Sequence, residues 1–389
     1  MSLSNITLTA AVRQNLLSLQ GTADLLATTQ GRLATGKKVN SALDNPTNFF
    51  TAAGLDARAS DISNLLDSIG NGVQVLQAAN TGITSLSKLV DTAKSIANQV
   101  LQQPSGYTAK STVTSAAALG GTAANLVDGV TIKSGQTIIV AANGSLPALT
   151  VTIGASESLD QLNTALAAGN LTASLDSANK LVITTTNDYA SSTIGAVTVG
   201  STPGTATFGA AVAPVADAVS QATRASLVGQ YNQIISQITT TAQDASFNGI
   251  NLLNGDSLKL VFNETGKSTS TITGVTFSPT GLGLAALTSG TDFLDNSSTN
   301  AVLTKLNTAS TTLRSQASAF GANLSIVQIR QDFNKNIINV LQTGSSALTL
   351  ADSNEEAANS QALSTRQSIA TSALSLANQS QQSVLKLLQ

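Results

Sequence analysis

The sequence contains no histidine, no cysteine and no tryptophan, and aromatic residues make up only 3% of it. Without cysteine there is no disulfide and no thiol nucleophile, and without histidine there is no imidazole base. A zinc site built from Cys and His ligands is excluded for the same reason. We therefore expect no enzymatic activity, no catalytic residue, no cofactor and no bound metal.

Charged residues are also scarce. They make up 10% of the 389 residues, against about 25% in an ordinary globular chain. The 19 basic and 21 acidic residues give a net charge of −2, so the basic surface that nucleic-acid binding requires is missing. Ser, Thr, Gln or Asn interrupts every apolar run well short of the ~20 residues of a membrane span, and no secretory signal is visible. We expect no nucleic-acid partner, no membrane insertion and no export by the general secretory route.

The prolines divide the chain into a middle part and two flanks. Four of the six lie between 104 and 214, whereas 47–103 and 280–389 contain none. Because proline breaks helix interiors, the middle part must be built differently from the flanks.

Four segments of the flanks carry residues spaced alternately by four and three, as a coiled-coil seam requires. They span 12–33, 62–100, 302–341 and 363–388. At 1.5 Å per residue, helices over 55–101 and 299–342 would each be roughly 65–70 Å long, which predicts a rod. Several seam positions are polar, such as Gln30 and Asn334. They either fix the register, or belong to helices that find their partners in other copies of the chain.

The middle part has the period of strands. The pattern predicts two strands within 130–140, a strand at 149–153, a short helix at 158–166 capped by Ser156 or Ser158, and a hairpin of 171–175 with 180–184. A helix follows at about 217–243, and then a second hairpin of 258–261 with 271–277. The predicted fold is mainly α: a long coiled-coil-like helical rod built from both chain ends, with a β-hairpin and a small inserted α+β outer domain.

Three local patterns contain residue types found in catalytic motifs but lack the rest of what those motifs require. Gly31–Lys38 matches a phosphate-binding loop, but it lacks the following Ser or Thr and lies within a heptad run. Gly281–Ala286 resembles a dinucleotide fingerprint only weakly. Glu355 and Glu356 are adjacent, so on a helix they point in different directions.

Several segments resemble the signatures of bacterial flagellins. Leu33–Pro46 resembles the N-terminal signature, Phe247–Leu253 the segment that precedes the flagellin hairpin, and Arg330–Phe333 with Ala377–Leu388 the C-terminal signature. They occur in the family's order and belong to regions of resemblance at about 1–103 and 217–389.

The resemblance implies a domain layout. Residues 1–44 and 345–389 would form inner-tube helices, 45–103 and 217–344 a rod domain with a hairpin at about 258–278, and 104–216 a surface-exposed outer domain. The implied filament-interface residues are Leu16, Leu19, Leu26, Leu33, Leu374, Val384, Leu385 and Leu388. The implied rod-signature residues are Asn40, Asp44, Phe247, Asn248, Gly249, Arg330 and Phe333.

The resemblance also implies a function: a structural subunit that self-assembles into the extracellular flagellar filament for swimming motility. Export would proceed unfolded through the flagellar type III channel. The implied partners are other copies of the chain, the filament cap, the hook–filament junction proteins and an export chaperone. A hook–filament junction protein is the close alternative, because it shares the terminal helices. An adhesin on a coiled-coil stalk, or an enzyme, would belong to a different class.

Two departures from the family pattern bear on partners. Flagellins that the innate receptor detects carry Leu-Gln-Arg-Val-Arg-Glu-Leu-Ala in the first rod helix, where this chain has Lys88 in place of the first Arg and Thr92 in place of the second Leu. Lysine lacks the bidentate fork of arginine, so we expect weak or no receptor activation.

The position of the insertion is the second departure. In flagellins the outer domains usually follow the hairpin, whereas here the insertion precedes it. Its possible O-glycan acceptors are Ser191, Ser192, Thr193, Ser201, Thr202 and Thr205.

Overall fold

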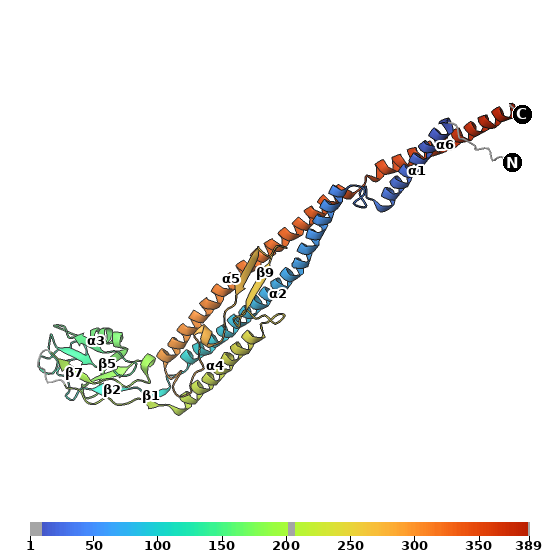
Figure 1. Cartoon of the computed structure of the whole chain (residues 1–389). Helices are drawn as coiled ribbons and strands as arrows, with labels where there is room; N and C mark the ends of the chain where they lie inside the picture. Colours follow the sequence, from blue (N-terminus) through green and yellow to red (C-terminus); the bar gives the residue numbers. More distant parts are fainter. Residues whose placement is uncertain (1–9, 201–206, 388–389) are drawn as a thin grey trace. The chain divides into compact units, whose positions relative to one another are not determined.

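The computed structural model describes residues 10–200 and 207–387 (Figure 1). The chain divides into two compact units. Unit 1 comprises 1–71, 260–270 and 326–389, and unit 2 comprises 72–259 and 271–325. The unit boundary falls inside the two longest helices, rather than at the limits of the rod domain proposed from the sequence. Those domain limits therefore remain a prediction.

Each heptad run lies within a single helix as far as its residues are described, as predicted. The four helices are α1 (Ala10–Thr35), α2 (Pro46–Gln102), α5 (Asn296–Thr349) and α6 (Ser353–Leu387). Helix α1 ends before Gly36, whose φ of 67° is a left-handed conformation that glycine adopts without strain. Helix α2 begins on Pro46, where a missing N–H costs nothing. Both long helices extend several residues beyond the predicted bounds of 55–101 and 299–342.

The predicted seams of α2 and α5 are buried. Along α2 every residue of the 62–100 run is buried, except the half-buried Leu65. Along α5 the 302–341 run is buried or half-buried at every position but Arg330. Within unit 1 the two helices are antiparallel neighbours: Leu341 packs with Ile62, and a Cβ built on Gly344 would lie 3.5 Å from Leu55. The alternating spacing therefore identified the packed face correctly.

The described part of the segment between α2 and α4 (Ala218–Asp244) holds eight strands and a short α-helix. These are β1 (Tyr107–Ala109), β2 (Thr112–Thr114), β3 (Thr137–Val140), β4 (Leu149–Thr152), α3 (Leu159–Leu166), β5 (Leu171–Leu175), β6 (Leu181–Thr185), β7 (Val197–Gly200) and β8 (Val215–Ala216). The antiparallel sheets have the orders β2-β6-β5, β4-β3-β7 and β1-β8. Ser158 caps α3 in a full capping box with Gln161.

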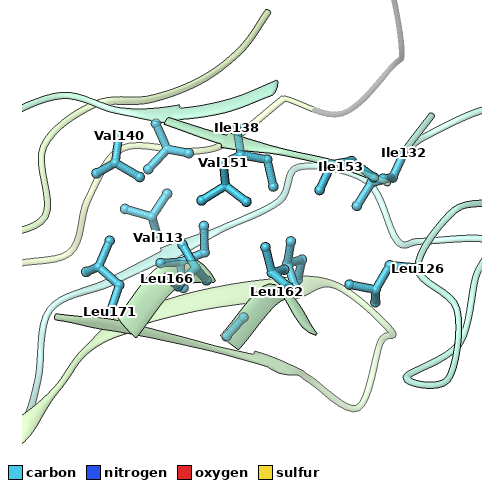
Figure 2. Close-up of a cluster of buried hydrophobic side chains, with 14 of the residues drawn as sticks. Val113, Leu126, Ile132, Ile138, Val140, Val151, Ile153, Leu162, Leu166 and Leu171 are labelled. Atoms are coloured by element: carbon cyan, nitrogen blue, oxygen red, sulfur yellow. The ribbon is translucent and has the colours of Figure 1, made fainter. Parts of the chain in front are cut away.

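The core of this inserted domain lies between its two three-stranded sheets and α3. Figure 2 shows Ile138 and Val140 of β3 and Val151 of β4 on one side of the core, facing Leu162 and Leu166 of α3. All five side chains are almost completely buried. Alternation along β4 places Val151 inward between Thr150 and Thr152. Along β3 the outward residue between Ile138 and Val140 is Ile139, which is 37% exposed. The segment thus has an apolar core of its own.

One predicted strand is wrong. The pattern at 130–140 predicted two strands about a turn, but only Thr137–Val140 forms one. The N–H groups of Val130, Thr131 and Ile132 instead donate to Asp128 Oδ1 over 2.7–3.0 Å. Because one carboxylate oxygen accepts all three, the segment curls around Asp128 rather than pairing with a neighbouring strand.

Asp128 provides a pH-dependent anchor for this loop. Burial opposes its ionisation, but the N–H bonds from Val130, Gly120 and Ile132 outweigh that effect and lower the pKa of Asp128 to about 2. Its pKa in the unfolded chain is about 3.9. The anchor is therefore fully stabilising above about pH 4, and its contribution is lost as the pH falls toward about 2.

We expect Asp128→Asn to destabilise the inserted domain by about 1–2 kcal/mol at neutral pH. An amide would accept more weakly at one atom, and would turn its NH2 toward either the Gly120 N–H or the three N–H groups at Oδ1. Thermal unfolding of both chains across this acidic range is the measurement. The wild-type domain should lose stability on acidification and the variant should lose less; equal melting at neutral pH would contradict the anchor.

Two antiparallel strands connect the inserted domain to the helices. Tyr107 pairs with Ala216 and Ala109 with Val215. Beyond them, Thr112 and Val212 exchange both backbone hydrogen bonds, at 3.3 and 2.8 Å. The chain therefore enters and leaves the domain through one short ladder, which we call the neck.

The predicted second hairpin is present after α4. It consists of β9 (Ser257–Val261) and β10 (Thr269–Thr273), which starts two residues earlier than predicted. Its tip is closed by Asn263, whose side-chain oxygen accepts from the Ser268 N–H. The remaining short elements are the 3-10 turns η1 (Ala167–Gly169), η2 (Asn187–Tyr189) and η3 (Thr280–Leu282).

Candidate functional site

Helices α1 and α6 lie side by side in unit 1 (Figure 1). The Arg32 guanidinium of α1 contacts the Glu356 carboxylate of α6 at 3.1 Å. From Leu363 onward the half-buried positions of α6 are Leu363, Gln367, Ala370, Leu374 and Ala377, which is the predicted run as far as the side chains are described. The C-terminal seam therefore faces α1 within the same chain.

The predicted interface residues of α1 do not all face α6. Leu19 and Leu26 are half-buried, whereas Leu16 and Leu33 are 36% and 44% exposed. The buried and half-buried positions of α1 are Val12, Asn15, Leu19, Thr22, Ala23, Leu26, Thr29 and Arg32. The predicted run is therefore right at Val12, Leu19, Ala23 and Leu26, and wrong at the exposed Leu16, Gln30 and Leu33. In the C-terminal part, Leu388 lies outside the described residues, and so do the side chains of Val384 and Leu385.

Both helices keep apolar side chains on their outer faces. Leu17 and Leu25 of α1 are 64% and 58% exposed, and Ile369 and Leu376 of α6 are 63% and 68% exposed. Ile369 and Leu376 lie seven residues apart and thus share one face of α6. A chain with so much apolar surface on a two-helix segment is suited to packing against further helices.

The connection from α1 to α2 and the connection from α5 to α6 are hydrogen-bonded to each other. The N–H groups of Lys38 and Val39 both donate to the Thr349 carbonyl, and the Ala351 N–H donates to the Gly36 carbonyl. Lys37 and Leu350 form an isolated antiparallel bridge. The two breaks in the helices therefore form one structured joint.

The signature residues Asn40 and Asp44 shape the loop that leads into α2. Asp44 Oδ2 accepts from the N–H groups of Asn40 and Ser41, each at 2.9 Å. These bonds hold the pKa of Asp44 below its ordinary value, the Ser41 N–H contributing most. Asn40 Nδ2 donates to the Lys37 carbonyl at 3.1 Å. We call residues 40–45 the connector loop.

The signature residues Phe247, Asn248 and Gly249 form a tight turn after α4. Phe247 pairs with Ile250, and the φ angles of Asn248 and Gly249 are 49° and 78°. Two successive positive φ values define a turn for which Asn-Gly is the favoured pair. The sequence did not single out the next residue, Asn251, whose amide donates to the Ala242 and Gln243 carbonyls and so caps α4.

The signature residues Arg330 and Phe333 lie beside the hairpin tip. The Arg330 guanidinium lies 5.8 Å from the centre of the Phe262 ring, within cation–π range. The seam residue Asn334 is buried, and its amide donates to the Phe262 carbonyl at 3.0 Å. Asn334, a polar residue of the α5 seam, thus holds the hairpin tip by a hydrogen bond to its backbone. A cavity of about 210 Å³ lies here, lined by Arg58, Ile62, Phe262, Asn263, Glu264, Ser268, Arg330, Phe333, Asn334 and Ile337. We call it the hairpin cavity.

Arg224 of α4 holds the junction between the helices and the neck. Its side chain is 1% exposed and donates to the Pro104 carbonyl at 3.0 and 3.2 Å and to the Phe293 carbonyl at 2.8 Å. Burial lowers the pKa of Arg224, while the charge of Asp295 opposes that effect. Phe293 has a φ of 58°, an uncommon conformation for a bulky residue, and Arg224 bonds to its carbonyl. Sequence reasoning missed Arg224, because its partners are backbone atoms distant in sequence.

The proposed glycan acceptors differ in their surroundings. The Ser191 hydroxyl donates a hydrogen bond to the Asp295 carboxylate. A hydroxyl engaged in this way is a poor site for glycan attachment in this conformation. Ser192 and Thr193 are half-buried. Ser201, Thr202 and Thr205 lie outside the described residues. Glycosylation remains a prediction.

Within residues 10–200 and 207–387, no cluster of acidic side chains is arranged to hold a metal ion. None of the helices in these ranges combines the length and the apolar character needed to cross a membrane.

Comparison with known proteins identifies the family. The model of the bacterial flagellin N-terminal helical region matches residues 6–118, and the model of the C-terminal helical region matches residues 303–388. Together they cover just over half of the chain, and they include all of α1, α2 and α6 and most of α5. The chain belongs to the bacterial flagellin family. The flagellin matches span the two helix pairs described above and leave most of the inserted domain outside.

Individual flagellins of Caulobacter vibrioides are similar over a shorter stretch. Flagellin FljM is 32% identical over 163 residues, Flagellin FljK 30% and Flagellin FljO 29%. Each match covers 41% of this chain and 58% of the relative. The chain thus spans less than two thirds of the length of these relatives.

Proposed function

We propose that this chain is a structural subunit that self-assembles into a flagellar filament. The observation that carries the proposal is the α1–α6 pair, which packs through a narrow seam and keeps apolar residues on its outer faces. Burial of those faces between copies would stabilise a polymer by about 25 cal/mol per Å² of apolar surface. Membership of the flagellin family supports the same function, and that family is structural rather than enzymatic.

The remaining parts of the proposed function are supported only by the resemblance to flagellins. We propose that the subunit leaves the cell unfolded through the flagellar type III channel and acts outside it, in swimming motility. Its partners would be other copies, the filament cap, the junction proteins and an export chaperone. The inner-tube, rod and outer-domain roles of 1–44 with 345–389, 45–103 with 217–344, and 104–216 belong to this proposal.

Weak or absent recognition by the innate flagellin receptor also remains a proposal. Lys88 and Thr92 are both exposed on α2, so their side chains are accessible to a partner. The Thr92 hydroxyl donates to the Lys88 carbonyl of its own helix, and neither side chain offers the fork or the apolar contact that detected flagellins carry.

Polymerisation of the purified chain tests the filament function. Monomers seeded with short filament fragments should grow into long filaments, visible by negative-stain electron microscopy. A hook–filament junction protein would instead form short rings that do not elongate. Failure to elongate on any seed, by a chain shown to be folded by circular dichroism, would contradict the proposal.

A further inference from the structure

Leu43 is an apolar side chain on a rigid loop, in contact with almost nothing of its own chain. It is 96% exposed, the highest value among the large apolar residues of the described ranges. The connector loop is nonetheless fixed, because Asp44 accepts from Asn40 and Ser41 and the Leu43 N–H donates to the Ser41 hydroxyl. A leucine presented in this way loses little conformational freedom when a partner covers it.

The hairpin cavity offers a complementary surface. Its apolar lining comes from Ile62, Phe262 and Ile337, and Phe333 at its edge is 53% exposed. Two guanidinium groups also line it. That of Arg58 is paired with the Glu264 carboxylate at 2.7 Å. That of Arg330 lies over the Phe262 ring and forms no ion pair with any carboxylate of the described residues. A cavity of about 210 Å³ is large enough for one aliphatic side chain.

We propose that Leu43 of one copy seats in the hairpin cavity of a second copy, with Asp44 beside Arg330. This contact rests on the proposed filament function and names one of its subunit interfaces. The occupant is a second copy because the same chain supplies both halves of the match: an apolar knob next to a carboxylate, and an apolar cavity next to a guanidinium. No other partner is needed to explain either surface.

The arrangement also accounts for open-ended growth. The knob and the cavity are different surfaces, so the contact between two copies is head-to-tail and leaves one free knob and one free cavity. Such contacts generate open helical polymers when the rotation does not close a ring. The signature residues Asn40 and Asp44 would then serve to hold the knob in place.

Leu43→Asp tests the knob. Leu43→Met is the matched control, because it keeps the volume and apolar character of the side chain. We expect Leu43→Asp to raise the critical concentration for polymerisation about tenfold to hundredfold, and Leu43→Met to change it little. Thermal unfolding of both monomers should equal that of the wild type, because Leu43 is exposed. Equal critical concentrations for the wild type and Leu43→Asp would overturn the contact alone, whereas a wild-type chain that does not polymerise would overturn the filament function as well.

Cross-linking tests the partner surface, and the absence of natural cysteine makes it specific. Leu43→Cys and Ser268→Cys chains are mixed, polymerised and oxidised, with Ser268 chosen because it lines the hairpin cavity. A disulfide-linked dimer that forms only when both variants are present in the filament supports the contact. Filaments that contain both variants and yield no such dimer would overturn it.

Discussion

Leu26→Asp is expected to abolish filament formation. Leu26 lies in the middle of α1, half-buried on the side that faces α6. A carboxylate forced into that seam costs several kcal/mol unless it is protonated or paired. Because every copy carries the same substitution, each repeat of the assembly bears the cost, and it cannot be diluted. The measurement is seeded growth followed by electron microscopy.

Two comparisons make this result interpretable. Leu26→Met retains an apolar side chain of similar volume and should polymerise like the wild type. Thermal unfolding of unit 2 should be unchanged in Leu26→Asp, because α1 belongs to unit 1. Normal filaments from Leu26→Asp would mean that α1 does not lie in the polymer's packed interior. Leu385→Asp is expected to act in the same way on the evidence of the sequence alone.

The long helices could be predicted from sequence because their seams are unambiguous. In α2 the large apolar residues beyond Phe50 are all buried or half-buried, so the heptad spacing identified the buried positions directly. Helix α5 also carries exposed apolar residues such as Ile326 and Val340, but its 302–341 run still follows the buried face. In α1, apolar residues such as Leu16, Leu17 and Leu25 occur around much of the helix. Several faces could then serve as the seam, and α6 packs against one that includes the polar Thr22 and Thr29. Leucines of α1 that α6 does not cover, such as Leu17 and Leu25, therefore stay exposed in the single chain.

The polar anchors could not be predicted, since their partners are backbone atoms. Asp128, Asn251 and Arg224 each bind several main-chain groups, and nothing in their local sequence shows which groups will be near. Asp128 in particular turned a predicted strand into a loop. The exposed Leu43 and the hairpin cavity are likewise visible only once burial and packing are known. The signature segments did predict the class of protein, because the family that they resemble is the one whose models match the chain.

Removal of the inserted domain is expected to leave filament growth intact, if the domain lies on the filament surface as we propose. The neck defines where to cut. Because Thr112 and Val212 exchange both of their backbone hydrogen bonds, a two-residue Asn-Gly turn can join them as a hairpin. Deleting residues 113–211 in this way keeps β1, β8 and the contacts of Arg224. A deletion of residues 105–213 would instead remove β1 and with it the β1–β8 ladder of the neck.

The deletion also removes two hydrogen bonds at the start of α5. Ser191 donates to Asp295, which is 3% exposed, and the Asn296 amide donates to the Asp188 carboxylate at 3.1 Å in a solvent-exposed bond. Asp295 keeps its bond from the Ser298 N–H, so we expect a total loss of about 1 kcal/mol in unit 2. Ser191→Ala in the full chain is the matched control for the loss of the Ser191–Asp295 bond. Electron microscopy of the shortened chain should show filaments of reduced diameter. A shortened chain that is folded by circular dichroism, yet does not elongate on seeds, would place a necessary subunit contact within residues 113–211.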